Sequence, residues 1–61
     1  MSSLTQQELK SIYTEEDMLK GNINRMCVTH DRKELEDMHE YAIKRIDRIY
    51  AINARRFEND G

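Results

Sequence analysis

The side chains best suited to chemistry in this sequence are its single cysteine, Cys27, and its two histidines, His30 and His39. Cys27 and His30 are spaced so that they can meet across a turn, and Asp31 could add an oxygen ligand. A structural zinc site uses four ligands in paired spacings, and the second pair is missing here. We therefore predict no metal site and no cofactor.

Cys27 is also the only candidate for a catalytic nucleophile. Thiol catalysis needs a base and an orienting group held beside the sulfur. His30 is near in sequence, but the chain has no pocket-forming architecture and no glycine-rich loop for an oxyanion. We predict that the protein is not an enzyme. A single cysteine cannot form an intramolecular disulfide, which is typical of a reducing compartment.

The run Lys33-Glu34-Leu35-Glu36 looks faintly like the Ser-Gln-Glu-Leu-Asp signature of the small sporulation aspartyl-phosphate phosphatases. Glu34 and Leu35 match that signature, and Glu36 supplies an acid at the following position. The serine and the glutamine are absent, and the predicted loop before the run is shorter than in that family. We do not assign the chain to the family.

The longest element that the sequence predicts is a helix over residues 32–57. Asp31 and Glu34 predict a capping box at its start, and residues 58–61 are expected to form a frayed polar tail. Side chains spaced by three and four residues form one stripe of a helix. In this segment the stripe consists of Leu35, Met38, Ala42, Ile46, Ile49, Asn53 and Phe57.

Residues 5–28 allow two interpretations. One continuous helix suits the unbroken spacing of Leu9, Ile12, Glu16, Leu19, Ile23 and Met26. A joint near Thr14 is favoured by Glu16 in a core position and by a threonine in a helix interior. We favour the joint, with a helical arm over residues 1–13, opened by a Thr5–Glu8 capping box, and a helix over residues 14–28.

The predicted fold is all-α and forms one small domain. It is an antiparallel helical hairpin with a long C-terminal helix and a short N-terminal arm, because the connection after Val28 is short. A chain of 61 residues buries only about 60 % of its unfolded surface and is marginally stable alone. We therefore predict a homodimer with a core like a four-helix bundle, formed by Leu35, Met38, Ala42, Ile46 and Ile49.

Charge is distributed unevenly along the chain. The net charge of the whole chain is −2. Residues 1–43 alone carry a net charge of −4, and residues 44–56 carry a net charge of +4. Such a split favours antiparallel self-association or an oriented partner. No apolar run approaches the length of about 18 residues that a membrane span needs. The first residues also lack the pattern of a signal peptide, so we expect a cytoplasmic protein with no membrane partner.

The surface of the long helix gives the functional prediction. Tyr41 and Ile52 form a second apolar face beside a basic ridge of Lys44, Arg48 and Arg55. Tyrosine and arginine often dominate interface energetics. We predict a non-enzymatic regulatory or adaptor protein that modulates a larger protein, for example a transcription regulator, as small phage- or bacteria-encoded modulators do. The predicted partner contacts are Tyr41, Arg45, Arg48, Ile52 and Arg55.

Two other functions stay open at this point. The basic ridge could bind the phosphates of a nucleic acid, although the chain as a whole is acidic. A purely structural assembly module would bind no partner other than copies of itself.

Overall fold

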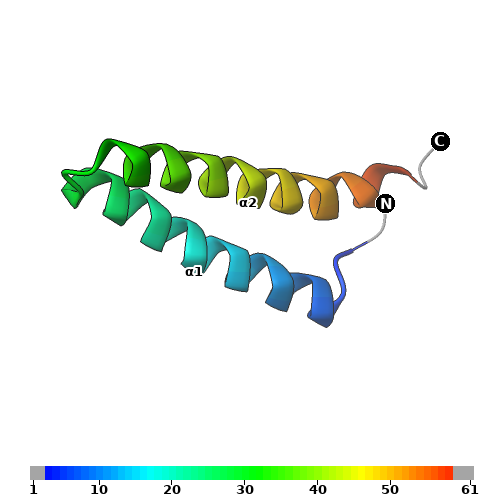
Figure 1. Ribbon diagram of the computed structural model, residues 1–61. Helices are drawn as coiled ribbons and strands as arrows, with labels where there is room; N and C mark the ends of the chain where they lie inside the picture. The colour runs from blue at the N-terminus through cyan, green and yellow to red at the C-terminus, as the bar shows by residue number, and fades with distance from the viewer. Residues whose placement is uncertain (1–2, 59–61) are drawn as a thin grey trace.

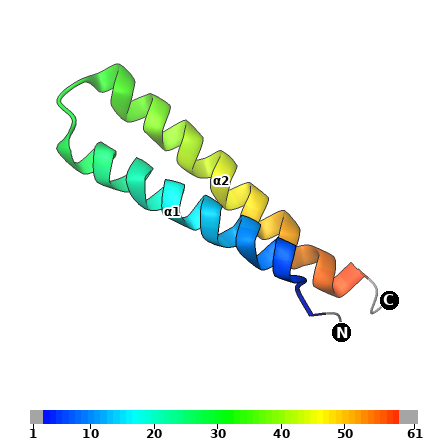
Figure 2. The same cartoon turned by 90° about the horizontal axis from the view of Figure 1, so that it is seen from below.

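The computed structural model describes residues 3–58, which form two helices, α1 over Gln6–Val28 and α2 over Arg32–Glu58. The helices run antiparallel and pack against each other as a hairpin (Figure 1). In the view turned by 90°, α1 lies in front of α2 near the end opposite the loop (Figure 2), and Figure 1 shows that the two helices spread apart there. The prediction of an all-α helical hairpin is confirmed.

α1 is one continuous helix, so the predicted joint near Thr14 is wrong. The Thr14 hydroxyl donates to the backbone carbonyl of Lys10 at 3.0 Å, which satisfies this side chain inside the helix. Glu16, whose expected core position argued for a joint, is exposed instead. The arm over residues 1–13 and the helix over residues 14–28 are therefore not separate elements, and residues 1–2 lie outside the described part of the chain.

The predicted cap at the start of α1 is confirmed. The Thr5 hydroxyl accepts a hydrogen bond from the Glu8 backbone N–H at 3.0 Å, and the Glu8 carboxylate accepts one from the Thr5 N–H at 2.9 Å. These reciprocal bonds satisfy two backbone donors that a helix N-terminus leaves without partners. They also hold the Glu8 side chain at a fixed place at the start of α1.

The start of α2 is capped differently from the prediction. The Asp31 carboxylate accepts from the Lys33 backbone N–H at 3.0 Å, as an N-cap residue does. The backbone N–H of Asp31 donates to the Thr29 hydroxyl at 3.1 Å, in place of a bond to Glu34. Glu34 pairs across the turn with Arg25 of α1, with 2.9 Å between Nε and Oε1. Glu34 therefore joins the two helices.

α2 ends one residue later than predicted. Glu58, which was expected to open the polar tail, closes the helix. The rest of the predicted tail, residues 59–61, lies outside the described residues.

The two helices meet along a seam in which polar and apolar side chains alternate. The α1 side of the seam is half-buried and consists of Glu8, Ile12, Glu15, Leu19, Asn22 and Met26. On α2, Ala42 is 5 % exposed and is the single fully buried hydrophobic residue within residues 3–58. The hairpin alone therefore buries very little apolar surface.

The hairpin is one helix thick. The backbone extends over 46 × 21 × 12 Å along its principal axes, and α1 and α2 form a single layer of two helices (Figure 1). Both broad sides of the hairpin therefore face outward. Within the described residues, neither α1 nor α2 combines the length and the apolar character needed to cross a membrane.

Gly21 provides a test of the continuous α1. It lies inside the helix with ordinary helical backbone angles, and a Cβ added there would meet no atom within 4 Å. Inside a helix, alanine is more favourable than glycine by about 0.8–1.0 kcal/mol. Gly21→Ala should therefore raise the free energy of unfolding by about that amount. Urea unfolding followed by circular dichroism measures the change. Gly21→Asn should raise the free energy of unfolding by less. A Gly21→Ala protein less stable than the wild type would contradict the finding that position 21 has room for a side chain.

Candidate functional site

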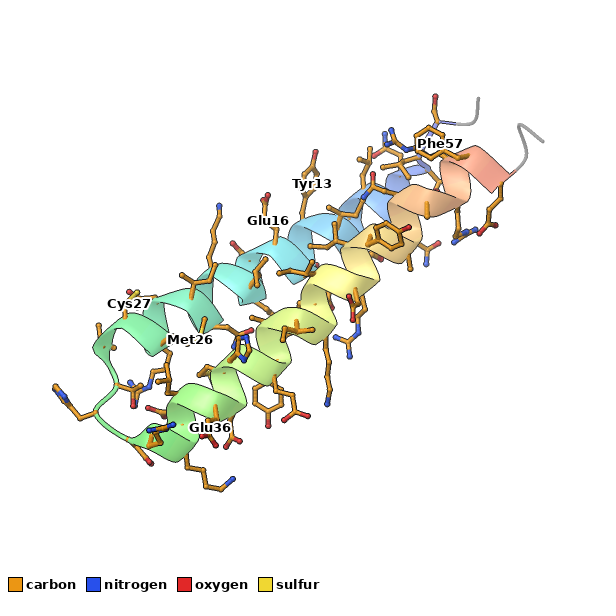
Figure 3. All side chains as sticks on the ribbon, turned by 90° about the horizontal axis from the view of Figure 1, so that it is seen from above. Tyr13, Glu16, Met26, Cys27, Glu36 and Phe57 are labelled. Carbon is orange, nitrogen blue, oxygen red and sulfur yellow. The ribbon has the colours of Figure 1, made fainter. Side chains whose placement is uncertain are left out.

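Helical spacing places a set of exposed apolar side chains on one broad side of the hairpin, which we call the apolar face. Its large members are Tyr13, Ile23, Leu35, Ile46, Tyr50 and Phe57. Ile46 is 51 % exposed and Tyr50 is 72 % exposed. Figure 3 shows Tyr13 extending from α1, with Phe57 near the C-terminal end of α2. Contiguous exposed apolar surface on a small protein typically marks an interaction site.

The residues predicted to form a dimer core are divided between this face and the seam. Ala42 is buried, and Met38 and Ile49 are half-buried. Leu35 and Ile46 are exposed. The apolar arc of α2 is thus wider than the part that α1 covers, and its uncovered edge belongs to the apolar face.

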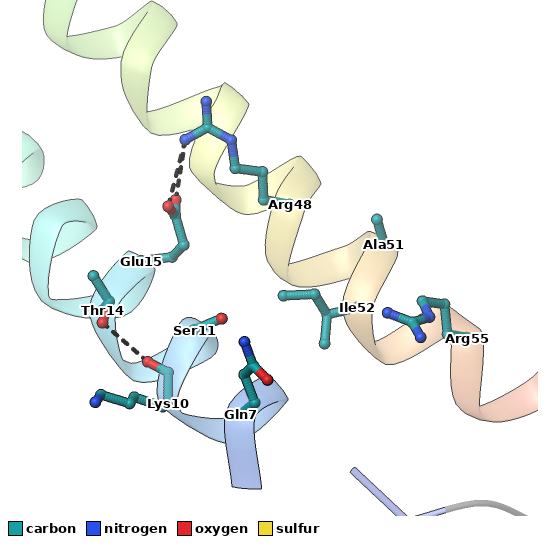
Figure 4. Close-up of a pocket in the computed structure, with 9 residues that line it drawn as sticks. All are labelled: Gln7, Lys10, Ser11, Thr14, Glu15, Arg48, Ala51, Ile52 and Arg55. Carbon is teal, nitrogen blue, oxygen red and sulfur yellow. Dashed lines mark hydrogen bonds and ion pairs between the residues drawn. The ribbon is translucent and has the colours of Figure 1, made fainter. Parts of the chain in front are cut away.

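The opposite side carries a groove between the two helices, which we call the cationic groove. Ser11 and Thr14 of α1 line one wall, and Arg48, Ile52 and Arg55 of α2 line the other. Its volume is about 690 Å³. In Figure 4, Ile52 points from α2 toward α1 and Arg48 reaches across to the neighbouring carboxylate of α1. The groove brings together three predicted partner contacts, Arg48, Ile52 and Arg55.

Two carboxylates of α1 hold the arginines of the groove. Glu15 accepts from Arg48 Nη1 at 3.3 Å, and Glu8 lies 3.1 Å from Arg55 Nη1. The carboxylate side chains are only 17 % and 18 % exposed, whereas Arg48 and Arg55 are 58 % and 65 % exposed. The guanidinium groups therefore lie outside the carboxylates, and the charge that faces outward is positive.

Arg45 takes a different place from the other predicted contacts. It is half-buried in the seam, 3.5 Å from Glu15, and its Nε donates to the Asn22 side-chain oxygen at 2.8 Å. The Asn22 amide in turn donates to Met38 Sδ at 3.4 Å. Arg45 thus belongs to a polar layer between the helices. Tyr41 is exposed but is not among the residues that line the groove.

Sequence reasoning missed the polar residues of α1 that shape this site, Glu8, Glu15 and Asn22. Each of them directly precedes a residue of the predicted stripe. Together with Ile12, Leu19 and Met26 of that stripe, they form a displaced series with the same alternating spacing of four and three residues. Both series are compatible with a helix. The signal that distinguishes them is charge, because an acidic residue in the displaced series meets an arginine of the antiparallel helix.

The side chains considered for metal binding or catalysis lie apart from the groove. Cys27, His30 and His39 are all exposed. Over residues 3–58, the structure assembles no group of three or more His, Cys, Asp or Glu side chains that could hold a metal ion.

Comparisons with known proteins assign no family to the chain. No protein-family model matches it, and neither the curated proteins nor the solved structures contain a significant match.

The ion pairs at the two ends of the hairpin alter the acidity of their carboxyl groups. The pKa of Glu8 is lowered from its ordinary value of 4.5, mainly by the hydrogen bond from the Thr5 backbone and also by the charge of Arg55. The pKa of Glu34 is lowered by hydrogen bonds with the side chains of Thr29 and Arg25. Folding therefore favours the charged form of both groups.

This makes the hairpin sensitive to acid. A carboxyl group whose pKa is lower in the folded state stabilises the fold above its ordinary pKa and loses that contribution as pH falls below it. We expect the thermal midpoint to be constant near neutral pH and to fall below pH 4.5. Circular dichroism melts across this range measure it. Glu34→Gln should reduce the dependence of the thermal midpoint on pH, whereas Glu16→Gln, on the exposed side of α1, should leave it unchanged. The same pH dependence in both variants would contradict the role given to Glu34.

Proposed function

We propose that the protein is a small cytoplasmic, non-enzymatic adaptor or regulator that binds a larger protein through the cationic groove and pairs with a second copy through the apolar face. The observation that carries this proposal is the shape of the hairpin. It is 12 Å thick, and its two open sides differ in chemistry. The proposal includes a transcription regulator as the larger partner and a phage or a bacterium as the source of the protein.

The exposed area supports the homodimer. A compact protein of 7.3 kDa is expected to expose about 4,200 Å², whereas this chain exposes 4989 Å². The excess is close to the roughly 800 Å² that each partner buries in a standard interface. A second copy placed on the apolar face would cover Leu35, Ile46, Tyr50 and Phe57 and complete a four-helix core.

The groove supports a separate protein partner. Arginine side chains that surround an apolar centre are the composition found at interface hot spots, and Arg48 and Arg55 here flank Ile52. Arg48, which lines the groove, follows Ile46 by two residues, and this spacing places the two side chains on opposite sides of α2. A dimer formed through the apolar face would therefore leave the groove of each copy open.

Direct nucleic-acid binding is the alternative for the same arginines. The exposed guanidinium groups favour it, but each member of the basic ridge is already paired with a carboxylate. Arg48 pairs with Glu15, Arg55 with Glu8, and Lys44 with Glu40 at 3.6 Å. Phosphate binding gains most from cations that are not already neutralised. We therefore place a protein partner first.

Ile46→Asp tests the dimer. A carboxylate at the centre of the apolar face would have to be desolvated without a partner, so the variant should be monomeric. Sedimentation equilibrium of the full chain measures the mass. Tyr41→Asp is the matched control, because Tyr41 is similarly exposed but lies outside the apolar face. A wild-type monomer, or an Ile46→Asp dimer, would contradict the assignment.

Arg48→Gln combined with Arg55→Gln tests the groove. The double variant should remain helical and should fail to retain the partner that the tagged wild-type protein captures from lysate of its source cells. Lys20→Gln with Lys33→Gln removes the same charge elsewhere and should retain it. The capture is repeated with nuclease. If the arginine variant still retains the partner, the groove is not the binding surface. If the wild-type protein no longer retains the partner after nuclease treatment, nucleic-acid binding is favoured.

A further inference from the structure

We propose that the ligand of the cationic groove is an acidic amphipathic helix of the partner protein. Its carboxylates would meet Arg48 and Arg55, and an apolar side chain between them would contact Ile52. This inference rests on the proposed function and adds the chemical nature of the partner segment to it.

The floor and the α1 wall of the groove suit an apolar side chain approached by a helix. Ala51 and Ile52 of α2 provide apolar surface. The α1 side is lined by Gln7, Lys10, Ser11, Thr14 and Glu15. The spacing of four and three residues places Gln7, Ser11 and Thr14 on one stripe of that helix. The small uncharged side chains of Ser11 and Thr14 leave room for a third helix to lie alongside.

The arginines supply the charge and the spacing. Arg48 and Arg55 are seven residues apart, which is two helical turns and about 10 Å along α2. Each is held from below by a carboxylate that is itself largely covered, Glu15 or Glu8. A guanidinium group has five N–H donors in a planar fork. The bonds to Glu15 use Arg48 Nη1 alone, so the same group can also bind an incoming carboxylate.

This geometry defines a pattern for the partner segment. A helix that lies along α2 presents residues seven apart on one stripe, at the same rise of about 10 Å. Two acidic residues at that spacing would reach Arg48 and Arg55 together. A leucine or isoleucine three or four residues after the first acid would then lie over Ile52. The expected pattern is an acid, two residues of any type, an apolar residue, three residues of any type and a second acid.

A helix fits the groove better than a phosphate backbone. The centre of the site, at Ala51 and Ile52, is apolar and offers no hydrogen bond from its side chains. A helix with two separated carboxylates places its charge at the arginines and its apolar side chain between them.

The test uses a synthetic probe and the full-length protein. The probe is a fluorescein-labelled alanine-rich peptide of about 18 residues, long enough to be helical, with glutamates seven residues apart and leucines at the two middle positions. A control peptide has the same composition but both glutamates moved by two residues, to the other side of its helix. Fluorescence anisotropy should show saturable binding of the first peptide and about tenfold weaker binding of the control, as expected when charge-assisted hydrogen bonds are lost.

Protein variants test the same contacts from the other side. Arg48→Gln with Arg55→Gln should weaken the first peptide by about tenfold or more and should remove the preference between the two peptides. Lys20→Gln with Lys33→Gln should leave both affinities unchanged. Circular dichroism of each variant shows that α1 and α2 are still formed.

Several outcomes would overturn the inference. Equal binding of the two peptides would exclude the pattern, and unchanged binding to the arginine variant would exclude the groove. Tighter binding of a single-stranded oligonucleotide of equal charge would reassign the groove to nucleic acid. If the peptides fail while lysate capture still depends on Arg48 and Arg55, the adaptor function stands and the helical ligand is wrong. If both fail, the proposed function is wrong as well.

Discussion

Two helices can cover only one side of each other, and the rest of this structure follows from that constraint. The apolar arc of α2 extends beyond the strip that α1 contacts, so Ala42 is buried while Ile46 and Tyr50 remain exposed. Here the hairpin is 12 Å thick, and its uncovered edges are the features from which function can be argued.

The ion pairs between α1 and α2 determine how the two helices align, and they add little to the stability of the hairpin. Arg25–Glu34 lies beside the loop, Glu15–Arg48 near the middle and Glu8–Arg55 at the open end. Ion pairs with one well-exposed member contribute little to the stability of a fold. Glu15–Arg48 and Glu8–Arg55 do, however, join acidic residues of α1 to the basic half of α2. Arg25–Glu34 joins a basic residue of α1 to the acidic half of α2, so the three pairs together favour one antiparallel register. The charge split in the sequence is satisfied within one chain.

The sequence predicted the hairpin and the extent of α2 but not the continuity of α1. Capping residues and helical spacing are local, so Thr5 and Asp31 gave reliable starting points. The choice between a stripe through Glu16 and one through Glu15 depends on which residue meets Arg45 and Arg48. That information lies in the other helix. For the same reason, spacing alone could not separate the seam residues Met38 and Ile49 from the exposed Leu35 and Ile46.

The groove was recognised only in part because the same residues serve the fold and the surface. The sequence pattern of α2 groups Arg45 with Arg48 and Arg55 as neighbouring cations. In the structure, however, Arg45 is half-buried and donates a hydrogen bond to Asn22. What makes Arg48 and Arg55 available is the position of their carboxylates, which lie beneath them on α1. Such a carboxylate orients the guanidinium group before any partner arrives, which lowers the conformational entropy lost on binding. An ion pair that adds little to the stability of the hairpin can therefore still prepare a binding surface.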